Sequence, residues 1–244
     1  MRNIFVLIFL PLLSISQSNF NLQLLGSYQW SFSEGSDIWG WVDNSGNEFA
    51  LVCLNDGFSV VDVTNPSNLS EMFFISDLNS TWRDVKTWGN YAYITTEADA
   101  GLLIVDLNDM SGNTYWHKTT FTNSNGQMTE FTAAHNIFID ENGVAYIFGA
   151  SSNSGSNPSN GAIFLDVASD PINPIYLGEW DQNYIHDGMV RGDTMYAGCV
   201  YAGELFIVDV SNKFNPQTLG SKSTPSNFTH NAWVSDNGNH VFTT

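Results

Sequence analysis

The sequence predicts an all-β protein built from repeated units of four antiparallel strands, and three observations lead to this prediction. A strand phrase that ends in Asp followed by Val or Leu recurs, with its aspartates at positions 62, 106, 166 and 209. A turn containing Gly or Asn precedes the strand before each phrase, which is typical of β-hairpins. No long stretch shows the 3.6-residue period of an amphipathic helix.

The unit around Asp62 shows the order of its elements. A polar opening at Ser36 begins the first strand, and the turn 44–47 leads to the second strand at 50–52. A third strand ends at Asp62, and a Pro-containing turn at 64–66 leads to the fourth. Four strands in roughly 40–45 residues match the size of one propeller blade. We therefore expect a β-propeller of four-stranded antiparallel blades.

The repeats also predict the extent of the propeller, which we place at residues 24–244. The Ser/Asn/Gly-rich segment 151–160 is expected to be a surface loop inside one unit. Because propellers protect their strand edges by closing the ring, we interpret the chain as about four blades plus the truncated start of a fifth, a fragment of a longer polypeptide. The expected blades span roughly residues 36–75, 82–122, 134–180, 185–222 and 229–244.

The charge of the chain limits its partners. Seven Lys and Arg residues stand against 25 Asp and Glu residues, which gives a formal net charge of −18. Such a surface repels phosphate backbones and anionic lipids, so we expect no nucleic-acid partner. Hydrophobic residues make up 43% of the chain, which is enough to form a buried core.

The N-terminus predicts export. Arg2 precedes an apolar run at 4–13, and small residues at 14 and 16 favour cleavage, so residues 1–16 are interpreted as a signal peptide. We therefore expect a secreted or cell-surface protein. The two cysteines, Cys53 and Cys199, occupy equivalent strands of units that are not sequence neighbours, so we expect them to be buried and unpaired.

Several phrases resemble a known family. The strands 60–63, 103–106 and 206–210 resemble LVIVD repeats. Longer phrases at 36–40, 82–86, 134–138, 186–193 and 229–233 resemble the choice-of-anchor B family of exported bacterial proteins. The resemblance implies a surface or extracellular propeller attached to the membrane through a C-terminal device, and this chain ends before any such region. It implies no established activity.

The first strands of the five units open with polar residues that align. The first aligned position holds Ser, Arg and three His residues, and the second holds Asp or Asn. Because first strands line the central channel of a propeller, these positions would form a ring although they are distant in sequence. The candidate ligand-binding residues of this ring are His135, His186, His230, Asp37, Asp84, Asp187, Arg83, Asn136 and Asn231.

The candidate metal ligands in this ring are His135, His186 and His230. Neutral imidazoles suit Zn, Cu, Fe or Ni, and the aspartates of the ring would orient them, so the cofactor would be a divalent metal ion. A hard cation held by the aspartates is an alternative. Arg83 favours instead an anionic ligand or an internal salt bridge. A purely structural interpretation is that these side chains hydrogen-bond backbone groups at strand starts.

Two functional hypotheses follow from these patterns. The first is an exported binding or scaffold module whose partner is an extracellular protein or a carbohydrate. The second is a metal-dependent enzyme, a hydrolase or an oxidoreductase, that uses the histidine ring. No catalytic residue is assigned. The geometry of the imidazoles separates the hypotheses, since a shared metal requires them to lie within about 4–5 Å of one another.

Overall fold

The computed structural model describes residues 22–31, 33–152 and 160–244. The expected signal peptide lies outside the described residues. The described part is all β apart from one short 3₁₀-helix, Pro225–Asn227. Most of its strands form four-stranded antiparallel sheets in sequential order, which confirms the predicted class.

Each four-stranded sheet is a meander in which successive strands pair, and we number these sheets as blades. Blade 1 contains β1 (Gly35–Val42), β2 (Glu48–Leu54), β3 (Gly57–Asp62) and β4 (Ser70–Ser76). Blade 2 contains β5 (Arg83–Trp88), β6 (Tyr91–Thr96), β7 (Leu102–Asp106) and β8 (Tyr115–Lys118).

The next two blades repeat this order. Blade 3 contains β11 (Asn136–Ile139), β12 (Val144–Phe148), β13 (Ala162–Asp166) and β14 (Ile175–Trp180). Blade 4 contains β15 (Asp187–Arg191), β16 (Thr194–Cys199), β17 (Glu204–Asp209) and β18 (Gln217–Ser223).

Two hairpins complete the described strands. Blade 5 is the two-stranded pair β19 (Ala232–Val234) and β20 (Val241–Thr243). The second hairpin, β9 (Thr120–Thr122) with β10 (Met128–Glu130), was not expected from the repeat. Blade 2 therefore ends at Lys118 in the structure, whereas the expected boundary was 122. Phe121 of this hairpin stacks on Phe131, with ring centroids 5.1 Å apart, and thus extends the neighbouring core.

The blades are held together by apolar cores between their faces. In β12, Val144, Tyr146 and Phe148 face the core toward blade 4, while Ala145 and Ile147 face the core toward blade 2. Because side chains alternate across a strand, a continuous apolar run can serve two cores at once. This explains why the second and third strands of each repeat are largely hydrophobic.

The recurring aspartates end the third strand of each blade. Asp62, Asp106 and Asp209 each accept a hydrogen bond from the backbone N–H two residues later, at 2.9, 2.9 and 2.8 Å. Asp166 accepts two such bonds, from Ala168 and Ser169. The repeated Asp therefore shapes the turn, as its position before a polar segment indicates.

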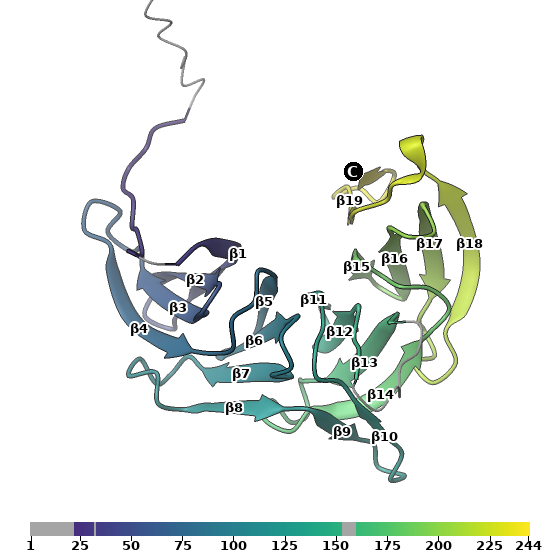
Figure 1. Cartoon of the computed structure of the whole chain (residues 1–244), viewed down its shortest axis with the longest axis horizontal. Coiled ribbons are helices and arrows are strands. Elements are labelled where there is room, and N and C mark those ends of the chain that lie inside the picture. The colour runs from purple at the N-terminus through teal and green to yellow at the C-terminus, as the bar shows by residue number, and fades with distance from the viewer. Residues whose placement is uncertain (1–21, 32, 153–159) are drawn as a thin grey trace, which may run out of the picture.

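The blades lie along an open arc (Figure 1), with their first strands on the inner side and their fourth strands outside. The inner strands β1, β5, β11, β15 and β19 contact one another in this order. Their opening residues are thereby brought around one central space.

In the described part of the chain, no helix is long and apolar enough to cross a membrane. Cys53 and Cys199 are buried and free, as predicted.

Candidate functional site

The opening residues of the inner strands converge as the alignment predicts. Asp37 lies on β1, and Arg83 and Asp84 begin β5. The three histidines stand immediately before or close to their inner strands, as His135 before β11, His186 before β15 and His230 before β19. One cavity of about 180 Å³ is lined by all three imidazoles together with Asp37 and Asp84.

The three imidazoles pack in a row. The ring centroids of His135 and His186 are 3.9 Å apart, and those of His186 and His230 are 4.0 Å apart. The planes are tilted by 52° and 46°. Residues separated by about one repeat in sequence thus touch, because the inner strands of adjacent blades lie side by side.

Two of these imidazoles are oriented through Nδ1. In His135, Nδ1 lies 2.6 Å from Oε1 of Glu97, and in His186, Nδ1 lies 3.2 Å from the carbonyl oxygen of His230. Both partners accept hydrogen bonds, so we assign a proton to Nδ1 of each ring.

The central imidazole resists protonation. Burial, followed by the proximity of His135 and His230, lowers the pKa of His186 to about 4, although its bond to the His230 carbonyl acts in the opposite direction. His186 is therefore neutral at pH 7. A neutral ring at the centre lets the three imidazoles remain in contact without repulsion.

The aspartates of the ring bind the next blade. Oδ2 of Asp37 accepts a hydrogen bond from the Val85 N–H at 3.1 Å, and Oδ2 of Asp84 accepts one from the Ile137 N–H at 3.1 Å. The Asn136 side-chain amide also donates to Asp84. The structural interpretation of the ring therefore holds for Asp37 and Asp84, which join adjacent inner strands.

Lys86 is a channel residue that the alignment missed. Its Nζ lies 2.6 Å from Oδ1 of Asp84 and 3.6 Å from Oδ2 of Asp37, and it stands 4.7 Å from the ring centroid of Trp39. A signal was present in the sequence, because alternate residues of a strand share a face and Asp84 and Lys86 are two apart. The Lys86 ammonium supplies the positive charge that pairs with the carboxyl groups of Asp37 and Asp84.

The pKa values of the two carboxyl groups beside Lys86 shift in opposite directions. Burial and the neighbouring Asp37 raise the pKa of Asp84. Burial also raises the pKa of Asp37, but the hydrogen bond with Asp84 and the charge of Lys86 outweigh it, so that this pKa lies below its usual value. The two carboxyl groups and the ammonium therefore form one cluster linked by hydrogen bonds and ion pairs.

Arg83 forms an internal salt bridge, one of the two alternatives that its position suggested. Its buried guanidinium donates from Nη1 to Oδ2 of Asp77 at 2.8 Å and from Nε to the Leu54 carbonyl at 3.0 Å. Although burial opposes it, the hydrogen bonds of His117 and the Leu78 N–H and the charge of Arg83 lower the pKa of Asp77 to about 2. Arg83 is thus satisfied within the protein.

The remaining ring members differ from this pattern. Burial raises the pKa of Asp187, and its own neighbour Gly188 donates a backbone hydrogen bond to it. Oδ1 of Asn231 accepts a hydrogen bond from the Thr244 hydroxyl at 3.1 Å. Both side chains line a second cavity of about 210 Å³, which also contains Lys86 and Trp233. Asp37, Asp84, Asn136 and Asp187 line both cavities and separate the histidine level from the lysine level.

Further aromatic rings extend the histidine row. The ring centroids of Trp82 and His135 are 6.0 Å apart, and those of Phe228 and His230 are 5.8 Å apart. Tyr184 stands 6.4 Å from His186 and 4.8 Å from Tyr201. We call this set the aromatic row, and its members are Trp82, His135, His186, His230, Phe228, Tyr184 and Tyr201. Tyr184, Tyr201 and Phe228 come from connections, where no repeated pattern identifies them.

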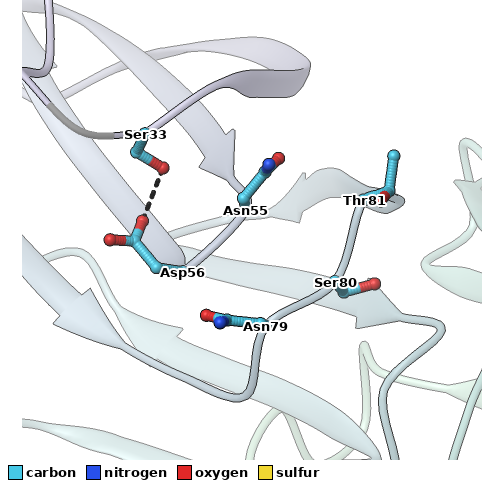
Figure 2. A pocket seen from close by; sticks show the side chains of 6 residues that line it. All are labelled: Ser33, Asn55, Asp56, Asn79, Ser80 and Thr81. Atoms are coloured by element: carbon cyan, nitrogen blue, oxygen red, sulfur yellow. Dashed lines mark hydrogen bonds between the residues drawn. The ribbon is translucent and has the colours of Figure 1, made fainter.

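Another cavity, of about 410 Å³, lies outside the channel at one end of blade 1. Figure 2 shows its six small polar side chains, which come from the β2–β3 turn, the β4–β5 connection and the segment before β1. Its single carboxylate, Asp56, already accepts a hydrogen bond from the Ser33 hydroxyl at 2.6 Å. This cavity offers less chemical definition than the channel.

The donor atoms do not yet form a metal cage. Among the described residues, no three His, Cys, Asp or Glu side chains are placed to hold a metal ion. The two neighbouring pairs of the row, His135 with His186 and His186 with His230, nevertheless lie within the separation that the sequence hypothesis required of all three imidazoles. Metal binding by His135, His186 and His230 remains a prediction.

Comparison with known proteins places the chain in a repeat class. The LVIVD repeat model matches residues 42–77, 81–114 and 190–224, which lie in blades 1, 2 and 4. The chain also superimposes on the β-propeller domain of Cps50 (Swd1) from Myceliophteria thermophila, with a TM-score of 0.54 at 12% identity over 84% of this chain and 61% of that one. This chain is a β-propeller that carries LVIVD repeats.

Other solved structures resemble the LVIVD propeller at similar distance. PorZ of Porphyromonas gingivalis, described as an essential bacterial surface component of the type-IX secretion system, gives a TM-score of 0.61 at 15% identity. It aligns over 94% of this chain and 33% of PorZ. A putative 6-phosphogluconolactonase from Bacteroides fragilis gives 0.56 at 10% identity, over 79% and 55% of the two chains.

These likenesses establish the fold of the LVIVD propeller and nothing finer. The chain spans a third to about three fifths of the length of these three structures. A search among curated proteins found no match.

Proposed function

We propose that this LVIVD propeller is the binding module of an exported protein, secreted or displayed at the cell surface, and that it binds its partner at the channel mouth. Export is supported by the charged, apolar and small-residue order of residues 1–16. Attachment to the membrane would then depend on a C-terminal anchor, as in the choice-of-anchor B family. The partner would be an extracellular protein or a carbohydrate.

The aromatic row carries this proposal. Trp82, Phe228 and Tyr201 are 52%, 52% and 84% exposed, although large aromatic side chains contribute most to stability when they are buried. They surround the only place where imidazoles of three blades meet in the described structure. Exposed aromatic rings beside a polar cavity are typical of binding sites.

The carboxylates of the channel support binding over acid–base chemistry. Asp37 and Asp84 accept backbone hydrogen bonds from the neighbouring blade and also contact Lys86. A general acid or base must reach the reacting atom, and these two groups are already engaged in holding blades together. Their role is to hold adjacent inner strands together at the channel mouth.

Ligand-observed NMR with a panel of small probes tests the proposal. The panel contains neutral monosaccharides, amino acids, alkylamines and carboxylic acids. The double variant W82A/F228A removes two exposed rings of the row. The matched control Y115A/F214A removes a Tyr and a Phe that are 43% and 58% exposed on blades 2 and 4 and line neither channel cavity.

We expect at least one probe class to bind the wild type and the control but not W82A/F228A. Binding that is equal in both double variants would place the site elsewhere and contradict the proposal. Circular dichroism and urea unfolding verify that both variants fold.

A metal-dependent hydrolase or oxidoreductase is the second candidate, and the orientation of the imidazoles favours it. Metal-bound histidines usually donate their other ring N–H to a carboxylate or a carbonyl, as Nδ1 of His135 and His186 does. The absence of a formed three-ligand cluster among the described residues weighs against it. Elemental analysis after incubation with Zn²⁺ or Cu²⁺ decides: stoichiometric metal that is lost in H186A would support the second candidate, and no retained metal would refute it.

A further inference from the structure

The aromatic row offers apolar ring faces and polar edges together. Trp82 and Phe228 stand at its two ends, and Tyr201 projects beside it with 84% of its surface exposed. A sugar ring has the matching chemistry, because its C–H face is apolar while its hydroxyl groups lie around the edge. Stacking the C–H face on an exposed aromatic ring removes apolar surface of both from water.

The imidazoles add acceptors for hydroxyl groups. Nδ1 of His135 and of His186 is used within the protein, and in His186, which is neutral at pH 7, Nε2 is left to accept. The Glu97 side chain that orients His135 is 43% exposed and has acceptor capacity left on its carboxylate. Sugar hydroxyls supply donors for all of these atoms. A ligand with acceptors alone would leave them unpaired.

The charge of the protein and the size of the cavity further restrict the class of ligand. The chain carries a net charge of −18, and carboxylates of Glu97, Asp37 and Asp187 surround the histidine level. Arg83 is the only Lys or Arg that lines the histidine cavity in the described structure, and it is paired with Asp77. Anionic ligands are therefore repelled. A cavity of about 180 Å³ is of the order of one sugar unit and well below that of a typical drug-sized pocket.

We propose that the aromatic row binds a neutral glycan, with one sugar unit in the histidine cavity and flanking units stacked on the exposed rings. The inference rests on the proposed function and names its ligand class. Trp82 and Phe228 provide stacking surfaces, and His186 accepts a hydroxyl hydrogen bond through Nε2.

Isothermal titration calorimetry with defined oligosaccharides tests this assignment. The probes are linear oligomers of glucose, mannose, xylose and N-acetylglucosamine, with an oligogalacturonate as the anionic probe and an alkylamine as the cationic one. The protein variants are W82A, the conservative W82F, and the control F214A, whose Phe is 58% exposed but lies in the connection between β17 and β18.

We expect at least one neutral oligomer to bind, about tenfold or more weakly to W82A and within about twofold to W82F and F214A. The anionic probe should not bind. Binding of the alkylamine or the galacturonate, with no neutral sugar bound, would overturn the glycan assignment while leaving a binding site at the mouth. If no oligosaccharide or control probe binds in calorimetry and no probe of the NMR panel binds either, both the glycan assignment and the proposed function are wrong. Loss of binding in F214A equal to that in W82A would also refute the assignment.

Discussion

Acid should loosen the centre of the histidine row, and His186 provides the test. Its pKa is about 4 in the folded protein, against about 6.5 for an unperturbed histidine. The unfolded state therefore binds more protons between these two values. The contribution of His186 to stability is complete above about pH 6.5 and is lost as the pH falls toward 4.

The size of the effect follows from the shift. Each pKa unit corresponds to about 1.4 kcal/mol, which sets an upper limit of about 3 kcal/mol. Because His186 keeps some contact with solvent, screening reduces this, and we expect about 1–2 kcal/mol. The neighbours that oppose its protonation are His135 and His230.

The assay compares wild type with H186F, which keeps an aromatic ring and removes the titration. Urea unfolding at pH 7.5 and pH 4.5 gives the free energy of unfolding at each pH. Wild type should lose about 1–2 kcal/mol more than H186F between the two values. All other titrating groups are common to both proteins and largely cancel. The variant H240F, at an exposed position of the β19–β20 connection, should behave as wild type. Equal losses in wild type and H186F would refute the reasoning.

Two other predictions concern the scaffold. R83M should lower the free energy of unfolding by about 3–5 kcal/mol in urea titrations, because it leaves the buried Asp77 carboxylate without its guanidinium, and a loss below about 1 kcal/mol would show that the pair is dispensable. I147A should lower the free energy of unfolding by about 2–5 kcal/mol because it opens a cavity in the core between blades 2 and 3. I38A, at a residue that is 62% exposed, should lower it by under about 0.5 kcal/mol. Comparable losses in the two variants would contradict the division of β12 between two cores.

The repeat made the convergence of the histidines predictable. His135, His186 and His230 occupy equivalent positions, and a propeller turns equivalence in sequence into proximity in space. The same alignment identified the aspartates but not their bonds, since the Val85 and Ile137 amides that they bind belong to the next blade. Such contacts depend on the tertiary distance between blades.

Other features carried weaker signals or none. Lys86 follows Asp84 by two residues, so strand alternation places it in the channel, yet no other repeat has a lysine there to draw attention to it. Tyr201 and Phe228 lie in connections whose sequences do not repeat, and Glu97 finds His135 only after folding. The β9–β10 hairpin has no counterpart in the other units and therefore lies outside the pattern.

The most direct test of the central claim is a histidine-detected ¹⁵N NMR spectrum of the protein, recorded while the neutral oligosaccharide panel is added. The chain has five histidines, of which three lie in the aromatic row and two, His117 and His240, lie outside it. We predict that the Nε2 resonances of His135, His186 and His230 move while those of His117 and His240 stay in place. If no histidine resonance moves, or only those outside the row move, the channel mouth is not the glycan-binding site.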